Sequence, residues 1–183
     1  PLLPNGIFCR DDDFADPWAP HDAVMLQHGL GRSGNMWHGW VPHLSRDFRV
    51  IRMDLRGAAQ SADPGQGIRY SLDMLMRDFI DTMDALDIER VHFVGESLAS
   101  MLGVVLAARH PERVKSLTLM CTFAQGKLAS RFDPWLVWVG TRTFLGTRGM
   151  RRRAFLEFIL SPSERAERAG SLDTYAKELS AYL

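Results

Sequence analysis

The sequence predicts an α/β protein with a mostly parallel, doubly wound sheet, and three observations support this prediction. Short apolar runs alternate with longer stretches of helical periodicity up to about residue 122. Turn-forming residues separate most of these segments. The 183 residues suffice for one domain with a sizeable core. Regular alternation implies right-handed crossovers with helices on both faces of the sheet. We therefore expect a core at 1–122 and a different organisation at 123–183.

The expected strands are short apolar runs that stop at turns. Asn5-Gly6 predicts a turn before a short strand at 7–10. The run at 23–27 ends at His28-Gly29, as a buried strand would. Three further strands are predicted at 48–55, 90–94 and 114–122.

Three helices are expected between these strands. The first covers about 36–45, although Gly39 and Pro42 are unfavourable inside a helix. The second begins after Ser71, a good N-cap residue. Its apolar residues recur at helical spacing: Leu72, Leu75, Met76, Phe79, Ile80, Met83 and Leu86. The third helix is predicted at 98–109.

Residues 123–183 follow a different pattern. Aromatic and aliphatic residues lie there in helical segments that glycines and Pro162 interrupt. No further strand is expected in this part of the sequence. We therefore predict a helical lid over the carboxyl edge of the sheet.

The composition disfavours several classes of partner. Lys and Arg number 22, and so do Asp and Glu, so the formal net charge is zero and neither nucleic acid nor an anionic membrane is an expected partner. No stretch approaches the roughly 20 apolar residues that span a bilayer. Cys9 and Cys121 lie far apart, without metal-ligand spacing, and are expected to be free thiols in a reducing compartment, with a single disulfide as the less favoured alternative. We accordingly expect a cytoplasmic protein without a metal.

Ser97 stands where the strand of 90–94 meets the helix of 98–109. A serine on such a turn has its hydroxyl pushed out above the sheet edge, beside the first N–H groups of the helix. The turn needs small residues two positions before and after the serine. Gly95 satisfies this requirement, and Ala99 adds one methyl group. The pattern predicts a nucleophile, and the alternative is a serine that only caps the helix.

A glycine-rich turn at 28–31 can direct a second backbone N–H at the same point. Together with the N–H of Leu98 it would form an oxyanion hole, in which each donor stabilises the transition state by about 3 kcal/mol. We expect the His28 ring to bond this loop and to transfer no proton. The residues expected to line a substrate pocket are Gly29, Trp37, Glu96, Trp135 and Trp138.

Asp54 and Arg56 stand two residues apart at the carboxyl end of a strand. We expect them to pair and to brace adjacent loops, and substrate binding is the alternative. Asp54 precedes the serine in the chain, which argues against a role as a triad acid. No histidine occurs after His110. The other histidines are expected to be structural or solvent-facing, with His38 the first candidate for an unconventional base.

From about residue 5 to residue 122 the chain resembles α/β-hydrolase-fold proteins of the small esterase and enol-lactonase type. Four motifs, in this order and spacing, carry the resemblance: His28-Gly29, Asp54-Leu55-Arg56-Gly57, Gly95-Glu96-Ser97-Leu98-Ala99 and Ala107-Ala108-Arg109-His110-Pro111-Glu112-Arg113-Val114. The resemblance implies that Ser97 attacks a small carboxylic ester or lactone while the amides of Leu30 and Leu98 hold the oxyanion. It also implies a histidine, oriented by a carboxylate, that takes the serine proton, and no metal or organic cofactor.

The chain departs from this family in three places. Ala99 replaces the last glycine of the turn, and Ala58-Ala59 stand where the family often has His-Gly. The family places its acid and histidine after the lid, whereas this sequence stops at Leu183. Asp133 and Asp173 are not expected to replace them. Because losing the base costs a serine hydrolase on the order of a millionfold in turnover, we expect the 183 residues alone to be nearly inert.

Two other functions remain open on the sequence. One is a non-catalytic homologue that binds a ligand without turning it over. The other is a hydrolase relative of different chemistry, a perhydrolase or a C–C bond hydrolase. An unpaired edge on the last predicted strand would be an aggregation hazard. We therefore expect a homo-oligomer or a further C-terminal segment to cover it.

Overall fold

A computed structural model describes residues 1–16, 18, 20–122, 134, 138, 141–142, 145, 147–160, 162–167 and 170. The chain divides into two compact units, 1–124 and 125–183. The elements of the first unit, in chain order, are β1 (Cys9–Asp12), β2 (Asp22–Gln27), the 3-10 helix η1 (Gly34–Trp40), α1 (Val41–Leu44), β3 (Phe48–Met53), α2 (Leu72–Ala85), β4 (Val91–Glu96), α3 (Leu98–Arg109), the 3-10 turn η2 (Pro111–Arg113) and β5 (Val114–Met120).

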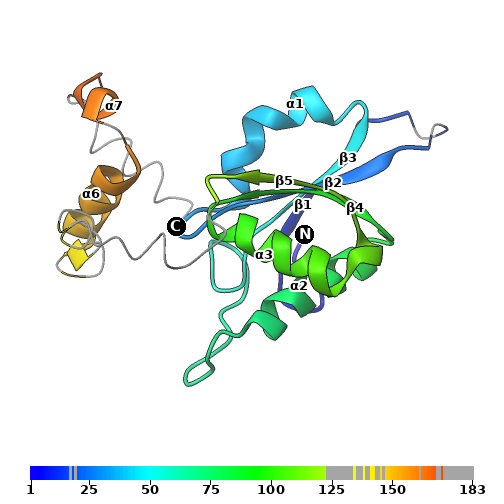
Figure 1. Cartoon of the computed structure of the whole chain (residues 1–183), viewed down its shortest axis with the longest axis horizontal. Helices are drawn as coiled ribbons and strands as arrows, with labels where there is room; N and C mark the ends of the chain where they lie inside the picture. The colour runs from blue at the N-terminus through cyan, green and yellow to red at the C-terminus, as the bar shows by residue number, and fades with distance from the viewer. Residues whose placement is uncertain are drawn as a thin grey trace. The chain divides into compact units, whose positions relative to one another are not determined.

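The five strands form one mixed sheet in the order β1-β3-β2-β4-β5 (Figure 1). Strands β2, β3, β4 and β5 are parallel, and β1 runs antiparallel beside β3. The predicted α/β class with a mostly parallel sheet is therefore confirmed. The first strand begins two residues later than predicted. The Asn5-Gly6 turn is closed by hydrogen bonds between Leu3 and Ile7 and between Gly6 and Leu3, so Ile7 still belongs to the turn.

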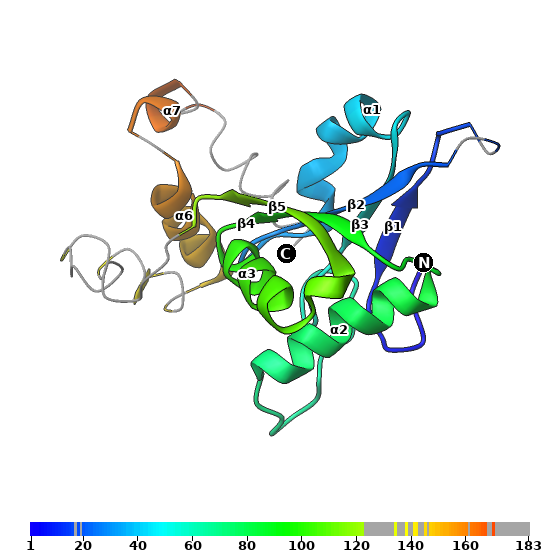
Figure 2. The same ribbon diagram turned by 45° about the vertical axis from the view of Figure 1, so that its right-hand side comes forward.

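Helices cover both faces of the sheet (Figure 2). On one face α2 and α3 bury the larger core, whose helical members include Met76, Phe79, Met83, Leu102 and Leu106. On the other face η1 and α1 bury a smaller core with Trp37 and Val41 against the strands. After β2 the chain adds β3 on one side of β2 in the sheet, whereas β4 lies on the other side of β2 and β5 follows beyond it. The chain thus reverses its direction of growth between β2 and β4, the point where sheets of this kind bind ligands at their carboxyl edge.

The helix predicted at 36–45 consists of two shorter pieces. Residues 34–40 form a 3-10 helix that contains Gly39, and the α-helix proper is only 41–44. Pro42 lies in the first turn of this short helix. There its missing N–H has no partner to lose. Pro42 therefore starts an α-helical turn and could not have stood in the interior of a longer helix.

The second predicted helix is confirmed together with its cap. The hydroxyl of Ser71 accepts the N–H of Met74 at 3.2 Å. Such a cap satisfies a backbone donor that the helix itself leaves without an acceptor. Helix α2 then runs for 14 residues with its apolar side on the sheet.

Helices α6 (Arg148–Ile159) and α7 (Pro162–Glu167) belong to the second unit. The hydroxyl of Thr147 caps α6 by accepting the N–H of Met150. An ion pair of 2.8 Å joins Arg142 to Glu157 within this unit. Among the helices of the described ranges, none combines the length and the apolarity needed to cross a membrane.

Candidate active site

Three loops meet at the carboxyl edge of the sheet because of the strand register. Gln27, the last residue of β2, lies opposite Gly95 of β4 on one side and Met53 of β3 on the other. The loops that begin at His28, Asp54 and Ser97 must therefore emerge side by side. The predicted nucleophile, the glycine-rich turn and the Asp54 loop share this edge.

The backbone of Ser97 is held in an unusual conformation between β4 and α3. Its φ is +55° and its ψ is −115°. A non-glycine residue in such a region costs about 1–3 kcal/mol and persists only where its surroundings enforce it. The N–H of Ser97 donates to the carbonyl of Met120 at 2.9 Å, and its carbonyl accepts the N–H of Ser100 at 3.0 Å. The turn is thus fixed on both sides.

Gly95 permits the backbone to fold back on itself. A Cβ at this position would lie 2.6 Å from the carbonyl oxygen of Ala99 and 2.8 Å from the nitrogen of Ser100. No side chain fits at such distances. The small residue predicted two positions before the serine is therefore needed, whereas Ala99 is accommodated in full burial.

The side chain of Ser100 stabilises the turn at Ser97 by bonding both β4, which leads into the turn, and β5. Its buried Oγ lies 2.6 Å from the carbonyl oxygen of Gly95 and accepts the N–H of Met120 at 3.1 Å. It therefore ties the end of β4 to the end of β5 below the turn. Sequence reasoning missed this residue, and its only signal was a serine at the third position of an otherwise apolar helix.

The side chain of Ser97 makes no capping hydrogen bond to α3, although the residue occupies the N-cap position. The hydroxyl of Ser71, by contrast, caps α2 in the ordinary way. The hypothesis that Ser97 merely caps its helix is therefore wrong. Its Cβ lies 3.0 Å from where a Cβ on Gly29 would stand, so the side chain adjoins the glycine-rich turn.

The glycine-rich turn is anchored by His28 and Glu96. The N–H of Gly29 donates to Oε2 of Glu96 at 3.0 Å. The carbonyl of Gly29 lies 2.7 Å from Nδ1 of His28. Nε2 of the same ring accepts the N–H of Leu55 at 2.9 Å, so Nδ1 carries the proton. Burial lowers the pKa of His28 and keeps it neutral. With both nitrogens bonded, His28 holds the loop, as predicted.

Asp54 braces three segments from a fully buried position. One carboxylate oxygen accepts the N–H of Gly34 at 2.7 Å, and the other accepts the N–H of Gln60 at 3.3 Å. Arg10 lies 3.5 Å from the same carboxylate. The bracing role is confirmed, but the predicted pairing of Asp54 with Arg56 is wrong.

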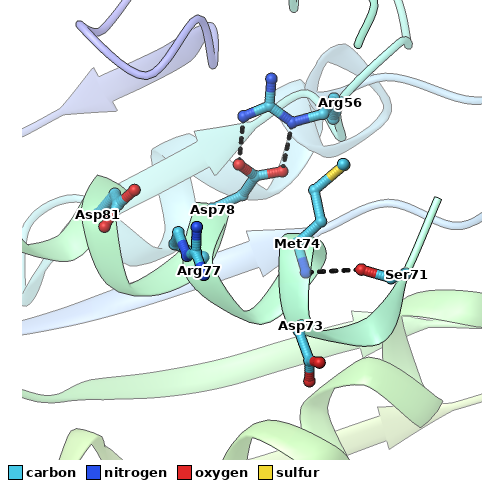
Figure 3. Close-up of a pocket in the computed structure, with 7 residues that line it drawn as sticks. All are labelled: Arg56, Ser71, Asp73, Met74, Arg77, Asp78 and Asp81. Atoms are coloured by element: carbon cyan, nitrogen blue, oxygen red, sulfur yellow. Dashed lines mark hydrogen bonds and ion pairs between the residues drawn. The ribbon is translucent and has the colours of Figure 1, made fainter. Parts of the chain in front are cut away.

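Arg56 turns instead toward α2 (Figure 3). Its guanidinium forms a two-pronged ion pair with Asp78, in which Nε donates to Oδ2 at 2.9 Å. The same group donates to the carbonyl of Asn5 at 3.0 Å. This hydrogen-bonded ion pair raises the pKa of Arg56. The ion pair borders a cleft of about 340 Å³ at the start of α2, whose lining includes Arg56 and Asp78 but not Ser97, Glu96 or Leu30.

Other predicted site residues are Leu30, Trp37, Trp135 and Trp138. Trp37 is packed in the smaller core, only 1% exposed, with its Nε1 buried and unbonded among the described residues. The side chain of Leu30 is exposed at the glycine-rich turn. Trp138 is exposed in the second unit, under the guanidinium of Arg142. Trp135 lies outside the described residues.

No histidine among the described residues is hydrogen-bonded to the hydroxyl of Ser97. His92 lies in β4 between Ser116 and Asp22. His110 faces Glu112, and His38 and His43 are exposed on the η1–α1 segment. In the same ranges of the chain, no three His, Cys, Asp or Glu side chains are grouped as a metal site requires.

Comparison with known proteins adds independent findings. The family described as the alpha/beta hydrolase fold matches residues 22–180. A 2-hydroxymuconate semialdehyde hydrolase of Pseudomonas sp. (strain CF600) is 36% identical over 100 residues, which are 53% of this chain and 35% of the relative. A pimeloyl-acyl-carrier-protein methyl ester esterase of Aeromonas hydrophila is 38% identical over 112 residues, which are 61% of this chain and 41% of the relative.

A solved structure matches nearly the whole chain. The enol-lactonase from Burkholderia xenovorans LB400 superposes with a TM-score of 0.65 at 24% identity, over 96% of this chain and 69% of that one. At this identity the likeness concerns the fold. The two curated relatives are matched over 35% and 41% of their length, so this chain spans well under half of each.

Proposed function

The chain belongs to the alpha/beta hydrolase fold family, and from this premise we propose that it carries the nucleophile and oxyanion site of a serine hydrolase. The proposed substrate is a small carboxylic ester or lactone. Support for an ester comes from the methyl ester esterase among its relatives. The sequence resemblance to the enol-lactonase type supports the cyclic form.

The proposed reaction passes through an acyl-enzyme. Oγ of Ser97 bonds to the carbonyl carbon as its proton moves to a base, and the N–H groups of Leu30 and Leu98 stabilise the oxyanion. The carbon–oxygen bond to the alcohol then breaks, and the alcohol oxygen takes the proton from the base. Water attacks the acyl-enzyme in the same manner and releases the acid. One water is consumed, and nothing is oxidised or reduced.

One observation carries the proposal most strongly. Ser97 adopts a strained backbone, and its side chain gives no hydrogen bond to the helix that it begins. Residues in costly conformations concentrate at functional sites. Leu98 is the first residue of α3, so its N–H has no acceptor within the helix. A hydroxyl that does not cap its helix, beside an amide without an acceptor inside that helix, suits acyl transfer.

We propose that the base and its carboxylate come from outside residues 1–183. His28 is committed to the loop, and the other histidines lie elsewhere, as described above. The stretch by which the relatives exceed this chain is the proposed source. Residues 123–183 are proposed to form the helical cap region of the hydrolase, a cytoplasmic protein, and Trp135 and Trp138 are kept as candidate residues of the substrate pocket. Intact mass compared with the encoded reading frame tests where the protein ends.

Substitution of the nucleophile tests the function itself. We expect Ser97→Ala, made in the complete protein, to lose all detectable turnover of 4-nitrophenyl acetate and of small lactones. Ser116→Ala changes a serine on β5 that bonds His92, and it should keep wild-type turnover. Unchanged turnover in Ser97→Ala would remove the nucleophile assignment. Tight ester binding without any turnover in the complete protein would favour the non-catalytic alternative.

A second candidate is hydrolysis of a carbon–carbon bond at the same serine site. The observation in its favour is the 36% identity to the 2-hydroxymuconate semialdehyde hydrolase. Parallel assays with a 4-nitrophenyl ester and with a semialdehyde ring-cleavage product separate the two. The ester hydrolase proposal predicts the higher kcat/KM on the ester, and the reverse order favours the second candidate.

A further inference from the structure

Glu96 connects the turn of Ser97 to the glycine-rich turn across 67 residues of sequence. Its carboxylate oxygen Oε2 accepts the N–H of Gly29 at 3.0 Å. A Cβ on Gly29 would lie 2.4 Å from this oxygen and 2.9 Å from the backbone oxygen of Glu96. The two backbones are therefore in direct contact, and the carboxylate closes the junction. The side chain of Glu96, next to the nucleophile, therefore holds the glycine-rich turn.

His28 holds the same loop from the other side. Its Nδ1–H donates to the carbonyl of Gly29 at 2.7 Å, and the N–H of Leu55 donates to its Nε2. The carbonyl of Gly29 and the N–H of Leu30 belong to one planar trans peptide, in which they point in opposite directions. Fixing the carbonyl therefore fixes the direction of the Leu30 N–H.

The two anchors have different consequences for the amides of the loop. The N–H of Gly29 is occupied by Glu96 and cannot serve an oxyanion. The N–H of Leu30 is the next donor along the loop, and its direction depends on how Gly29 is held. Together, Glu96 and His28 limit the rotation of the peptides on both sides of Gly29.

We infer that Glu96 is a positioning residue for acyl transfer. By accepting the N–H of Gly29 it fixes the His28–Gly29 peptide, and the next peptide, which His28 holds by its carbonyl, then directs the N–H of Leu30 at the carbonyl group that Ser97 attacks. This inference rests on the proposed function, since it presupposes that Ser97 is the nucleophile. It assigns to Glu96 a hydrogen-bonding task that depends on the reach of its side chain, and not on its charge.

Three substitutions of Glu96 separate the effect of the length of its side chain from the effect of its charge. Glu96→Gln keeps the length and an acceptor oxygen, Glu96→Asp keeps the charge but is one methylene shorter, and Glu96→Ala removes both. Glu89→Ala is the matched control, because Glu89 is exposed just before the opposite end of β4. All variants are made in the complete protein, which includes the proposed base outside residues 1–183. The readout is phosphonylation of Ser97 by an alkyl fluorophosphonate, followed by intact mass at a series of times and concentrations, which gives kinact and KI separately.

We expect kinact to fall about 10²-fold in Glu96→Ala and Glu96→Asp, the usual effect of displacing a catalytic group by about 1 Å. Glu96→Gln should stay within about tenfold of wild type, since a neutral hydrogen bond is roughly half as strong as a charged one. KI should stay unchanged in all three, and Glu89→Ala should match wild type in both constants. A purely structural role would lower the urea midpoint and leave kinact unchanged.

The outcomes separate a failure of the inference about Glu96 from a failure of the proposed function, in which Ser97 is the nucleophile. Wild-type kinact in Glu96→Asp overturns the inference and leaves Ser97 as nucleophile, and so does a larger loss in Glu96→Gln than in Glu96→Asp. If Glu96→Ala does not fold, these two variants still decide the question. Absence of phosphonylation at Ser97 in the wild-type protein overturns the proposed function, and the inference with it.

Discussion

Replacing Gly95 with alanine tests whether the turn at Ser97 depends on the close approach of β4 to the start of α3. The new Cβ would stand 2.6 Å from the carbonyl oxygen of Ala99, 2.7 Å from its carbonyl carbon and 2.8 Å from the nitrogen of Ser100. Favourable contacts need about 3.5 Å. Strand and helix must therefore separate by roughly 0.7–0.9 Å. All three atoms are backbone atoms, so no change of rotamer relieves the clash.

The cost follows from this displacement. Overpacking of a filled interior costs about 1–3 kcal/mol. Weakening the contact between Oγ of Ser100 and the carbonyl of Gly95 adds about 1 kcal/mol. We expect Gly95→Ala to lower the free energy of unfolding by about 2–4 kcal/mol. The same shift should slow phosphonylation of Ser97 by about 10²-fold.

Urea unfolding followed by tryptophan fluorescence measures the first effect, and intact mass after fluorophosphonate treatment measures the second. Gly39→Ala is the matched control, since a Cβ there meets no atom within 4 Å. It should change the stability by no more than about 1 kcal/mol, in the stabilising direction. A Gly95→Ala protein with the wild-type urea midpoint and wild-type reactivity would refute the argument from close approach.

Three further predictions concern the same edge of the sheet. Ser97→Gly should raise the free energy of unfolding by about 1 kcal/mol, because glycine adopts a positive φ without strain; a urea midpoint at or below that of Ser97→Ala would contradict this. Asp54→Ala should lower the free energy of unfolding by about 3 kcal/mol, because it leaves the N–H of Gly34 without its buried acceptor and Arg10 without its ion-pair partner. An unchanged thermal midpoint would argue against bracing. Because burial lowers the pKa of His28, only the unfolded chain gains its proton as the pH falls through about 6.5. The wild type should therefore lose stability between about pH 7.5 and 5.5, by at most about 1.4 kcal/mol per pH unit, and His28→Gln should lose less; equal slopes of urea midpoint against pH would contradict this.

Local chemistry explains which parts of the fold the sequence predicts well. Ser71 and the apolar residues after it define α2 through contacts within a few positions along the chain, and the helix lies where predicted. The turn at Ser97 is also a local pattern, since Gly95 and the serine lie two residues apart. The segment at 34–44 was harder to predict, because glycines and Pro42 made a 3-10 helix and a short α-helix equally compatible with its apolar pattern.

Partners distant in sequence explain what the sequence could not predict. Arg56 lies two residues from Asp54, yet it pairs with Asp78 on α2, because strand and helix packing decides which carboxylate it meets. The bond between Glu96 and Gly29 likewise depends on the register of β2 and β4. The sequence predicts that Trp37 lines the substrate pocket, because it is an aromatic residue near the glycine-rich turn. The 3-10 helix instead packs its side chain in the smaller core. Periodicity alone does not carry such information.

The most direct test is to find which residue an activated serine probe modifies. The complete protein, which includes the proposed base outside residues 1–183, is purified, treated with an alkyl fluorophosphonate, digested and mapped by tandem mass spectrometry. We predict a single phosphonylated peptide that contains residues 95–99, with the added mass on Ser97, and no label on the Ser97→Ala protein. An unlabelled wild-type protein, or a label on any other side chain, would contradict the account.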